Sequence, residues 1–407
     1  MSSTIKPFEI AVAEEKIQLL KQRLALAQFP DEVVDAEPWS RGPPLSEIKR
    51  LAQYWGNGFD WRKVEADLNR LPQFTTSIAV EGFGAYNVHF IHARSTVPHA
   101  ISLLFLHGWP GSFIEVTKIL PLLLSGGEDF PAFHVVAPSL IDFGFSSASR
   151  KISFNIDQHA EVCHKLMLAL GYDEYVVQGG DIGSLVARML AIKYGPQHCK
   201  AHHINSAAPA EPNAESHPQL YEQVQNTPLT ESELAGLQRA QVFGTEGHGY
   251  YRIQATKPQT VGYSMADSPV GFLAWIYEKL HDWTDDYPWT DDEVLTWVSI
   301  YYFSTAGPSA SNCIYYENEH RDPPIFPAVQ VYIDVPLGIA RLPRDLILLP
   351  KLWHHTMGPI VYEKEHPHGG HFAAWECPDM LVSDLRIMFG RGGGAYGCVK
   401  ERSGYQG

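Results

Sequence analysis

Long apolar runs and closely spaced cysteines are both missing from this sequence of 407 residues. The chain begins MSSTIKPFEIAVAEEKIQ, without an apolar stretch of signal-peptide length, and no charge-free run of about 18 apolar residues follows. The five cysteines are far apart and form no C-x-x-C pair, which is typical of free thiols rather than of disulfides or a zinc site. We therefore expect a cytoplasmic protein without a membrane anchor, a bound metal or cysteine chemistry.

Basic residues are also few. The sequence has 31 Lys and Arg against 46 Asp and Glu, a formal net charge of −15. Such a surface repels phosphate backbones and anionic lipids, so neither nucleic acid nor a membrane surface is expected as a partner. At 45% hydrophobic and 19% charged residues, the composition is that of an ordinary globular protein with a large core.

Helical patterns mark the beginning and the middle of the chain. EEKIQLLKQRLALAQFP, LSEIKRLAQYW and DWRKVEADLNRLP predict a helical extension over residues 1–73. Residues 211–324 contain VGFLAWIYEKL and DDEVLTWVSIYYF but no strand-like run, so we predict an inserted helical cap there. The glycine-rich residues 391–407 are predicted to be disordered.

Short apolar runs alternate with helical patterns between residues 74 and 210. The runs are AYNVHFIHA, ISLLFLHG, FHVVAPS, EYVVQGG and CKAHHIN, and several are continuous, as in parallel strands buried on both faces. VQVYIDV at 329–335 and PIVYEKE at 359–365 resume the pattern. Residues 74–210 and 325–390 are therefore predicted to be two parts of one α/β core with a mostly parallel, doubly wound sheet.

The stretch QGGDIGS, residues 178–184, lies between a strand pattern and a helix pattern. Its central Asp181 is flanked by small residues with the spacing of a nucleophile elbow, the strained turn that exposes a reactive side chain. Asp181 is thus a candidate nucleophile. The other interpretation is a tight turn in which Asp181 caps the following helix.

A second motif, LLFLHGWPGSF at residues 103–113, also runs from a strand into a turn. The backbone N–H of Trp109 in this turn could pair with that of Ile182 to form an oxyanion hole. The side chains of His107 and Pro110 are expected only to shape the loop.

The third motif is HPHGGHFAAWE at residues 366–376, just after the last predicted strand. His371 there and Asp345 in RLPRDLILLP complete the chain order nucleophile, acid, histidine. The competing residues are His354, His355, His366 and His368 for the base, and Asp334 and Glu363 for the acid.

Together these motifs resemble those of the microsomal-type epoxide hydrolases, and in particular their unanchored members, over residues 5 to 388. LHGWPGSF, QGGDIGS, TKPQTVGYSMADSPVGFLAWIYEK and GGHFAAWE carry the resemblance. It implies an α/β-hydrolase fold, a small hydrophobic epoxide as substrate, no cofactor and a homodimer. A role in detoxification or aromatic hydrocarbon catabolism is a further expectation.

The chemistry of an epoxide explains why an aspartate could replace serine. The electrophile is a strained sp³ carbon, and a carboxylate is ionised at neutral pH without help from a base. Asp181 would form an ester with the substrate, and water activated by His371, which Asp345 orients, would hydrolyse it. The N–H groups of Trp109 and Ile182 would stabilise the tetrahedral oxyanion.

The resemblance also assigns two proton donors and a pocket. Tyr250 in HGYYRIQATKP and Tyr315 in CIYYENEH would protonate the alkoxide of the opened ring, with Tyr251 and Tyr316 as alternatives one residue away. Trp109, Phe113 and Ile182 are expected to line the substrate pocket.

One loop departs from the family pattern. Where family members usually read P-S-L-P-G, this chain has Pro138-Ser139-Leu140-Ile141-Asp142. We expect the change to add the charge of Asp142 near the mouth of the active site and to alter substrate preference.

Three other functions compete. A haloalkane dehalogenase would share Asp181 and His371 but usually has Trp or Arg after the nucleophile, where this chain has Ile182. A serine esterase would need GPSAS at 307–311 as its elbow, and that segment lacks strand context. A non-catalytic small-molecule-binding homologue would not need to keep the nucleophile, acid, base and both tyrosines together.

Overall fold

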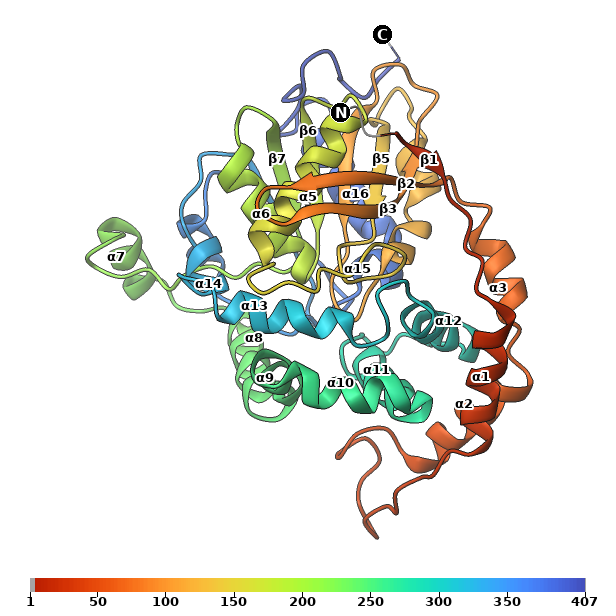
Figure 1. The fold of residues 1–407 in the computed structure, drawn as a ribbon. Helices are drawn as coiled ribbons and strands as arrows, with labels where there is room; N and C mark the ends of the chain where they lie inside the picture. Colours follow the sequence, from red (N-terminus) through yellow and green to blue (C-terminus); the bar gives the residue numbers. More distant parts are fainter. Residues whose placement is uncertain (1–3, 407) are drawn as a thin grey trace.

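The computed structural model describes residues 4–406, whose strands form one twisted sheet (Figure 1). The strands are β1 Lys6–Pro7, β2 Gln73–Val80, β3 Gly84–Ala93, β4 Ile101–Leu106, β5 Phe133–Pro138, β6 Tyr175–Gly179, β7 Cys199–Ile204, β8 Leu337–Arg341 and β9 Ile360–Glu365. Their order in the sheet is β1-β2-β3-β5-β4-β6-β7-β8-β9. Pairing is antiparallel from β1 to β5 and parallel from β5 to β9. The α/β fold with a mostly parallel sheet is therefore confirmed.

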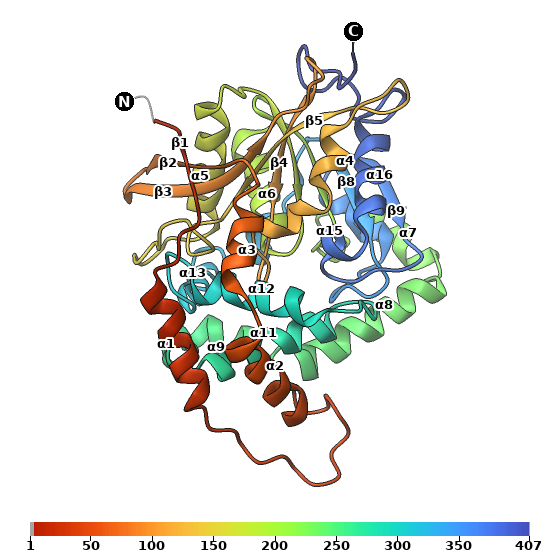
Figure 2. The ribbon, with the colours of Figure 1, turned by 90° about the vertical axis from the view of Figure 1, so that its right-hand side faces the viewer.

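Helices cover both faces of the sheet. The core helices are α4 Leu120–Leu124, α5 Ile156–Ala169, α6 Ile182–Tyr194, α14 Ile325–Val329, α15 Ala373–Glu376 and α16 Pro378–Phe389. Helices α5 and α6 pack together on one face, and α4 and α16 lie on the other (Figures 1 and 2). This double cover explains the continuous apolar runs, since every residue of β4 and β5 is buried.

Most of the cap helices lie together beneath the sheet in Figure 1, beyond the carboxyl end of β6, while the first of them stands apart on the left. They are α7 Pro218–Asn226, α8 Glu231–Val242, α9 Gly249–Thr256, α10 Pro258–Asp267, α11 Pro269–Asp282, α12 Asp291–Tyr302 and α13 Cys313–Glu319. Helices α8 and α12 begin with capping boxes, in which Thr230 pairs with Glu233 and Thr290 with Glu293. The inserted segment is thus helical as predicted, while its exact boundaries at 210 and 324 stay a prediction.

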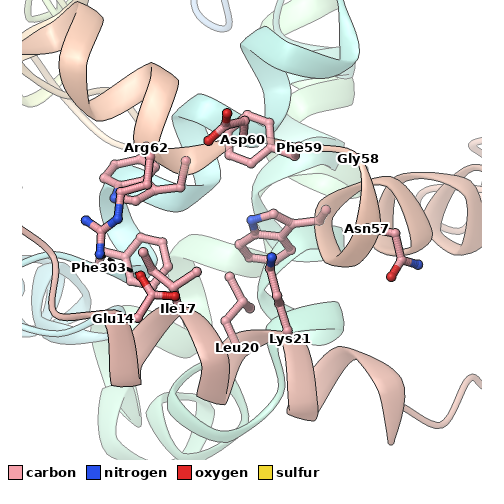
Figure 3. Close-up of a pocket in the computed structure, with 12 residues that line it drawn as sticks. Glu14, Ile17, Leu20, Lys21, Asn57, Gly58, Phe59, Asp60, Arg62 and Phe303 are labelled. Carbon is pink, nitrogen blue, oxygen red and sulfur yellow. Dashed lines mark hydrogen bonds and ion pairs between the residues drawn. The ribbon is translucent and has the colours of Figure 1, made fainter.

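The helices of the N-terminal extension pack against this cap (Figures 1 and 2). They are α1 Glu14–Ala25, α2 Leu45–Asn57 and α3 Trp61–Leu68. The indole N–H of buried Trp55 donates to Oγ of Ser299 on α12 at 3.0 Å. A pocket of about 260 Å³ opens among these helices, and Figure 3 shows the Glu14–Arg62 ion pair, 2.9 Å, at its edge. None of the predicted catalytic residues lines it.

The prediction of a strand at VQVYIDV, residues 329–335, is wrong. The segment holds the end of α14 and an irregular stretch, and the strand follows at β8 as LGIAR. The buried guanidinium of Arg188 donates to the carbonyls of Val329 and Val331, so these groups are satisfied by a side chain instead of a neighbouring strand.

The predicted disorder of residues 391–407 is also wrong for the part that the structure describes, up to residue 406. Val399 and Tyr405 are each 3% exposed. The backbone N–H of Gly404 donates to His99 O at 2.7 Å, and Gly404 O accepts from the N–H of Ala132 at 2.8 Å. Composition suggested disorder, but these aliphatic and aromatic side chains supply enough buried surface to order the tail.

Candidate active site

Asp181 stands in the turn between β6 and α6, in a conformation that costs backbone strain. Its φ is 51° and its ψ is −127°. A Cβ on Gly179 would lie 2.3 Å from Gly183 O, and one on Gly183 would lie 2.2 Å from Leu106 O, so the turn requires glycine at both places. The Asp181 side chain makes no capping hydrogen bond to α6. The geometry is that of a nucleophile elbow and not of a helix cap.

The turn after β4 supplies a donor to this carboxylate. The backbone N–H of Trp109 donates to Oδ1 of Asp181 at 2.8 Å. Ile182 is the first residue of α6, and the N–H groups of a first helical turn have no intrahelical partner. His107 is a scaffold, as expected: burial lowers its pKa to about 4, and its Nε2 accepts the N–H of Leu140 at 3.1 Å.

His371 and Asp345 meet Asp181 at the same place. Nδ1 of His371 is hydrogen-bonded to Oδ1 of Asp345 at 2.7 Å, and its Nε2 lies 3.5 Å from Oδ2 of Asp181. The N–H of Leu346 also donates to Oδ1 of Asp345, at 2.8 Å. Burial acts to lower the pKa of His371, but the two carboxylates outweigh it and raise that pKa to about 10. Imidazolium is therefore favoured while Asp181 is ionised.

Several of the competing residues are engaged elsewhere. His354 is hydrogen-bonded to Glu363 at 2.8 Å, and His366 to Asp384 at 2.6 Å. His368 lies 3.5 Å from the thiol of Cys377. The structure thus brings together Asp181, Asp345 and His371.

Two cap tyrosines face this group. Tyr250, on α9, stacks on the indole of Trp109 with ring centroids 5.0 Å apart, and Tyr315, on α13, packs edge-on against the same indole at 5.8 Å. Burial, together with the charge of Asp181, raises the pKa of both phenols well above the usual value of 10. The buried hydroxyl of Tyr315 has no hydrogen-bond partner among the described residues. Both phenols therefore stay protonated at neutral pH.

The adjacent tyrosines are placed differently. Tyr251 donates its hydroxyl to Glu319, and Tyr316 stacks on His320 with centroids 3.9 Å apart. Tyr251 does reach the cavity beside Asp181, but its hydroxyl is already bound, and Tyr316 does not line that cavity. The geometry favours Tyr250 and Tyr315 as the pair with free access to a ligand.

A cavity of about 100 Å³ connects these groups. It is lined by Asp181, Ile182, Ser184, Leu185, Ser206, Ala207, Ala208, Phe243, His248, Tyr250, Tyr251, Ile314, Tyr315, Asn318, Ile325, Phe326, Leu346, Ile347 and His371. Its wall is mainly apolar, with carboxylate, imidazole and phenols converging at one end, as in a small-molecule site. Among residues 4–406, no group of three or more His, Cys, Asp or Glu could hold a metal ion.

Three of the predicted pocket features lie elsewhere. The side chain of Trp109 is 1% exposed and stacks on Tyr250, but it does not line the cavity. Phe113 is fully buried and packs against His89 and Phe145, outside the cavity lining. Asp142 is 4% exposed and accepts the N–H of Ser149 at 2.6 Å, so its charge does not stand at the mouth. Burial raises the pKa of Asp142 to about 6.

Two neighbours of the site were not predicted from the sequence. Trp283, just after α11, accepts the N–H of His371 with its carbonyl at 2.8 Å, and its ring lies 5.0 Å from the imidazole. Glu115 has a buried oxygen without a partner in the described structure, and burial raises its pKa to about 8. Glu115 stands two residues after LHGWPGSF and could have been found there, whereas a backbone carbonyl leaves no signal in a sequence.

Fold and site together define an α/β hydrolase with an aspartate in the nucleophile position. Comparison with known proteins agrees: residues 5–116 match the family model "Epoxide hydrolase N terminus", and residues 101–247 match "alpha/beta hydrolase fold". Epoxide hydrolase 1 of Sus scrofa is 33% identical, with 95% of this chain and 89% of that protein aligned.

Solved structures give the same result. The epoxide hydrolase of Aspergillus niger superimposes with a TM-score of 0.81 at 34% identity, covering 94% of this chain and 95% of that one. The juvenile hormone epoxide hydrolase of Bombyx mori superimposes with a TM-score of 0.85 at 29% identity, covering 94% and 93%. The chain belongs to the epoxide hydrolase family, whose reaction adds water to an epoxide and gives a vicinal diol. Within residues 4–406, no helix has both the length and the apolar character needed to cross a bilayer.

Proposed function

We propose that this enzyme opens its epoxide by direct attack of Asp181. Oδ2 of Asp181 bonds to a ring carbon, the C–O bond of the epoxide breaks, and Tyr250 or Tyr315 gives a proton to the departing alkoxide. The observation that carries this proposal is the convergence of Asp181, His371 and the two phenols on one apolar cavity, with Asp345 hydrogen-bonded to His371 behind it. The substrate is a small hydrophobic epoxide, because the remaining wall is mainly apolar.

Ester formation changes the protonation of His371. The pKa of His371 is raised to about 10 by the charges of Asp345 and Asp181, and the second charge disappears when Asp181 becomes an ester. The pKa then falls, His371 loses a proton, and this proton balances the one that the tyrosines gave to the alkoxide. Neutral His371 can now take a proton from water as the water attacks the carbonyl carbon of Asp181.

The tetrahedral intermediate places its negative oxygen where Oδ1 of Asp181 stands. The N–H of Trp109 already donates to that atom at 2.8 Å, and the N–H of Ile182 is the second donor. Collapse of the intermediate releases the diol and restores Asp181. We further propose, from the resemblance alone, that the enzyme is a cytoplasmic homodimer with no cofactor.

The test is to trap the ester. A His371→Ala variant mixed briefly with styrene oxide should gain the mass of one substrate, on the peptide that contains Asp181. The matched control is the same variant with Asp181→Ala, which should gain no mass. An adduct that also forms in the control, or no adduct in either protein, would exclude Asp181 as the nucleophile.

A further inference from the structure

The loop that carries His371 is held on both sides by one carboxylate. Glu376, the last residue of α15, accepts the backbone N–H of Phe372 on Oε1 at 2.9 Å. Its Oε2 accepts the N–H of Gly370 at 3.1 Å. The residues immediately before and after His371 are therefore both bound to the same side chain.

The same carboxylate also binds the cap. Oε2 of Glu376 accepts the N–H of Asp285, in the turn after α11, at 2.8 Å. Burial raises the pKa of Glu376 to about 7, so the side chain is a charged acceptor above that pH. Hydrogen bonds to a charged acceptor are stronger than neutral ones, and here three donors share it. Glu376 thus joins the histidine loop of the core to a turn of the cap.

The turn after α11 also accepts hydrogen bonds from the histidine loop. Oδ2 of Asp285 accepts the N–H of Gly369 at 2.8 Å, and Trp283 O accepts the N–H of His371 at 2.8 Å. A Cβ on Gly370 would lie 2.5 Å from Trp283 O, so the backbones approach as closely as glycine permits. The position of the imidazole consequently depends on the docked cap.

We propose that Glu376 is a positioning residue for the hydrolysis of the ester, and that it acts together with Asp285 of the cap. This inference rests on the proposed role of His371. The attack of Asp181 on the epoxide does not require an aligned imidazole, whereas the activation of water does. A Glu376→Gln side chain keeps the shape but has one acceptor oxygen and no charge, so the loop loses part of its anchoring.

Rapid mixing with styrene oxide, acid quenching and mass spectrometry of the Asp181 peptide measure the two steps separately. In Glu376→Gln we expect ester formation to stay within about 2-fold of wild type and ester hydrolysis to fall by about 10- to 100-fold, so that the ester accumulates. The matched control is Asp379→Asn, an exposed carboxylate three residues further on, which should change neither step.

The contribution of the cap is tested at Asp285. Asp285→Ala removes the acceptor of the Gly369 N–H and should also slow ester hydrolysis selectively, while Asp285→Asn keeps a carbonyl oxygen there and should restore most of the rate. An unaffected Asp285→Ala would exclude the Asp285 side chain from the positioning of His371.

Two other results would overturn the inference. Equal losses in both steps of Glu376→Gln would show a purely structural role, and unchanged hydrolysis would show none. Failure of the proposed function is recognised separately, because His371→Ala would then form no ester on Asp181 at all.

Discussion

At the residue scale, the negative charge of Asp181 determines the states of its neighbours. It helps to raise the pKa of His371 and the pKa values of Tyr250 and Tyr315. All three groups therefore carry protons before the reaction, when a proton donor is needed. The ester neutralises that charge, so the same residues favour proton removal when a base is needed.

The two phenols should each be important for ring opening. We expect Tyr250→Phe and Tyr315→Phe to lower the rate of ester formation by about 10²- to 10⁴-fold, since each loses a proton donor without losing its ring. Single-turnover kinetics with styrene oxide measures this rate. Tyr316→Phe is the matched control and should be unaffected; a strong defect there would move the donor role by one residue.

The bond between His371 and Asp345 predicts a pH-dependent contribution to stability. The pKa of His371 is raised from 6.5 to about 10 in the folded protein. A raised pKa stabilises the fold fully below the unfolded value and loses this contribution as pH rises through the folded value. The free energy of unfolding of wild type should therefore exceed that of Asp345→Asn more at about pH 6 than at about pH 10. Urea titrations at the two pH values measure the difference, and an unchanged difference would contradict the prediction.

The sequence predicted the main candidate residues because each is tied to a recognisable motif or chain order. Asp181 was indicated by its flanking small residues, and His371 by its position after the last strand. Phe113 was placed wrongly, because a residue that follows a motif closely in sequence can point away from the cavity. Trp283 was missed because its hydrogen bond with His371 is made by a backbone carbonyl, which any residue could supply.

At the element scale, burial on both faces made the central strands predictable, and the exceptions have local causes. β4 and β5 read as continuous apolar runs because helices cover them on both sides. Residues 329–335 have a similar composition, yet Arg188 binds their carbonyls and no ladder forms. Nothing in the local sequence reveals that a distant arginine will compete with a strand.

The elbow should not tolerate a methyl group. A Cβ on Gly183 would lie 2.2 Å from Leu106 O, which is backbone and cannot swing away. We expect Gly183→Ala to lower the free energy of unfolding by roughly 2 kcal/mol or more. Gly56→Ala, in α2, is the matched control: its Cβ would meet only the Leu24 side chain at 3.8 Å, and the change should stabilise the protein by about 0.5–1 kcal/mol. Urea denaturation distinguishes the two signs, and a neutral Gly183→Ala would show that the turn can relax.

At the scale of the whole molecule, the N-terminal extension is hydrogen-bonded to the cap that covers the site. Arg23 donates to the carbonyls of Ala266 and Asp267 at 2.9 and 3.0 Å, and Tyr54 donates to Asp292 at 2.8 Å. Between residues 4–73 and the proposed catalytic groups there is no side-chain hydrogen bond, and none of these groups lines the pocket among α1, α2 and α3. Besides pairing through β1 in the sheet, the extension contacts the cap, which carries Tyr250, Tyr315 and the turn that contacts His371.

Trp55 is the central contact between the extension and the cap, and its substitution tests this interface. It is 2% exposed, and its indole N–H donates to Oγ of Ser299 on α12. Trp55→Ala should lower the free energy of unfolding by about 3–5 kcal/mol through the cavity it leaves. Ser299→Ala should cost less, about 1–3 kcal/mol, because it only leaves the indole N–H unpaired.

The two variants should also change which helices and strands unfold locally. If the extension holds the cap in place, Trp55→Ala will accelerate deuterium exchange, relative to wild type, more for the amides of α12 than for those of the central strand β4. Strand β4 lies outside this contact. Trp39→Ala is the matched control, since Trp39 stacks on His281 at the partly exposed end of α11 and should leave α12 protected. Equal acceleration in α12 and β4 would mean that cap and sheet unfold as one unit, and that the extension stabilises the fold without acting on the cap in particular.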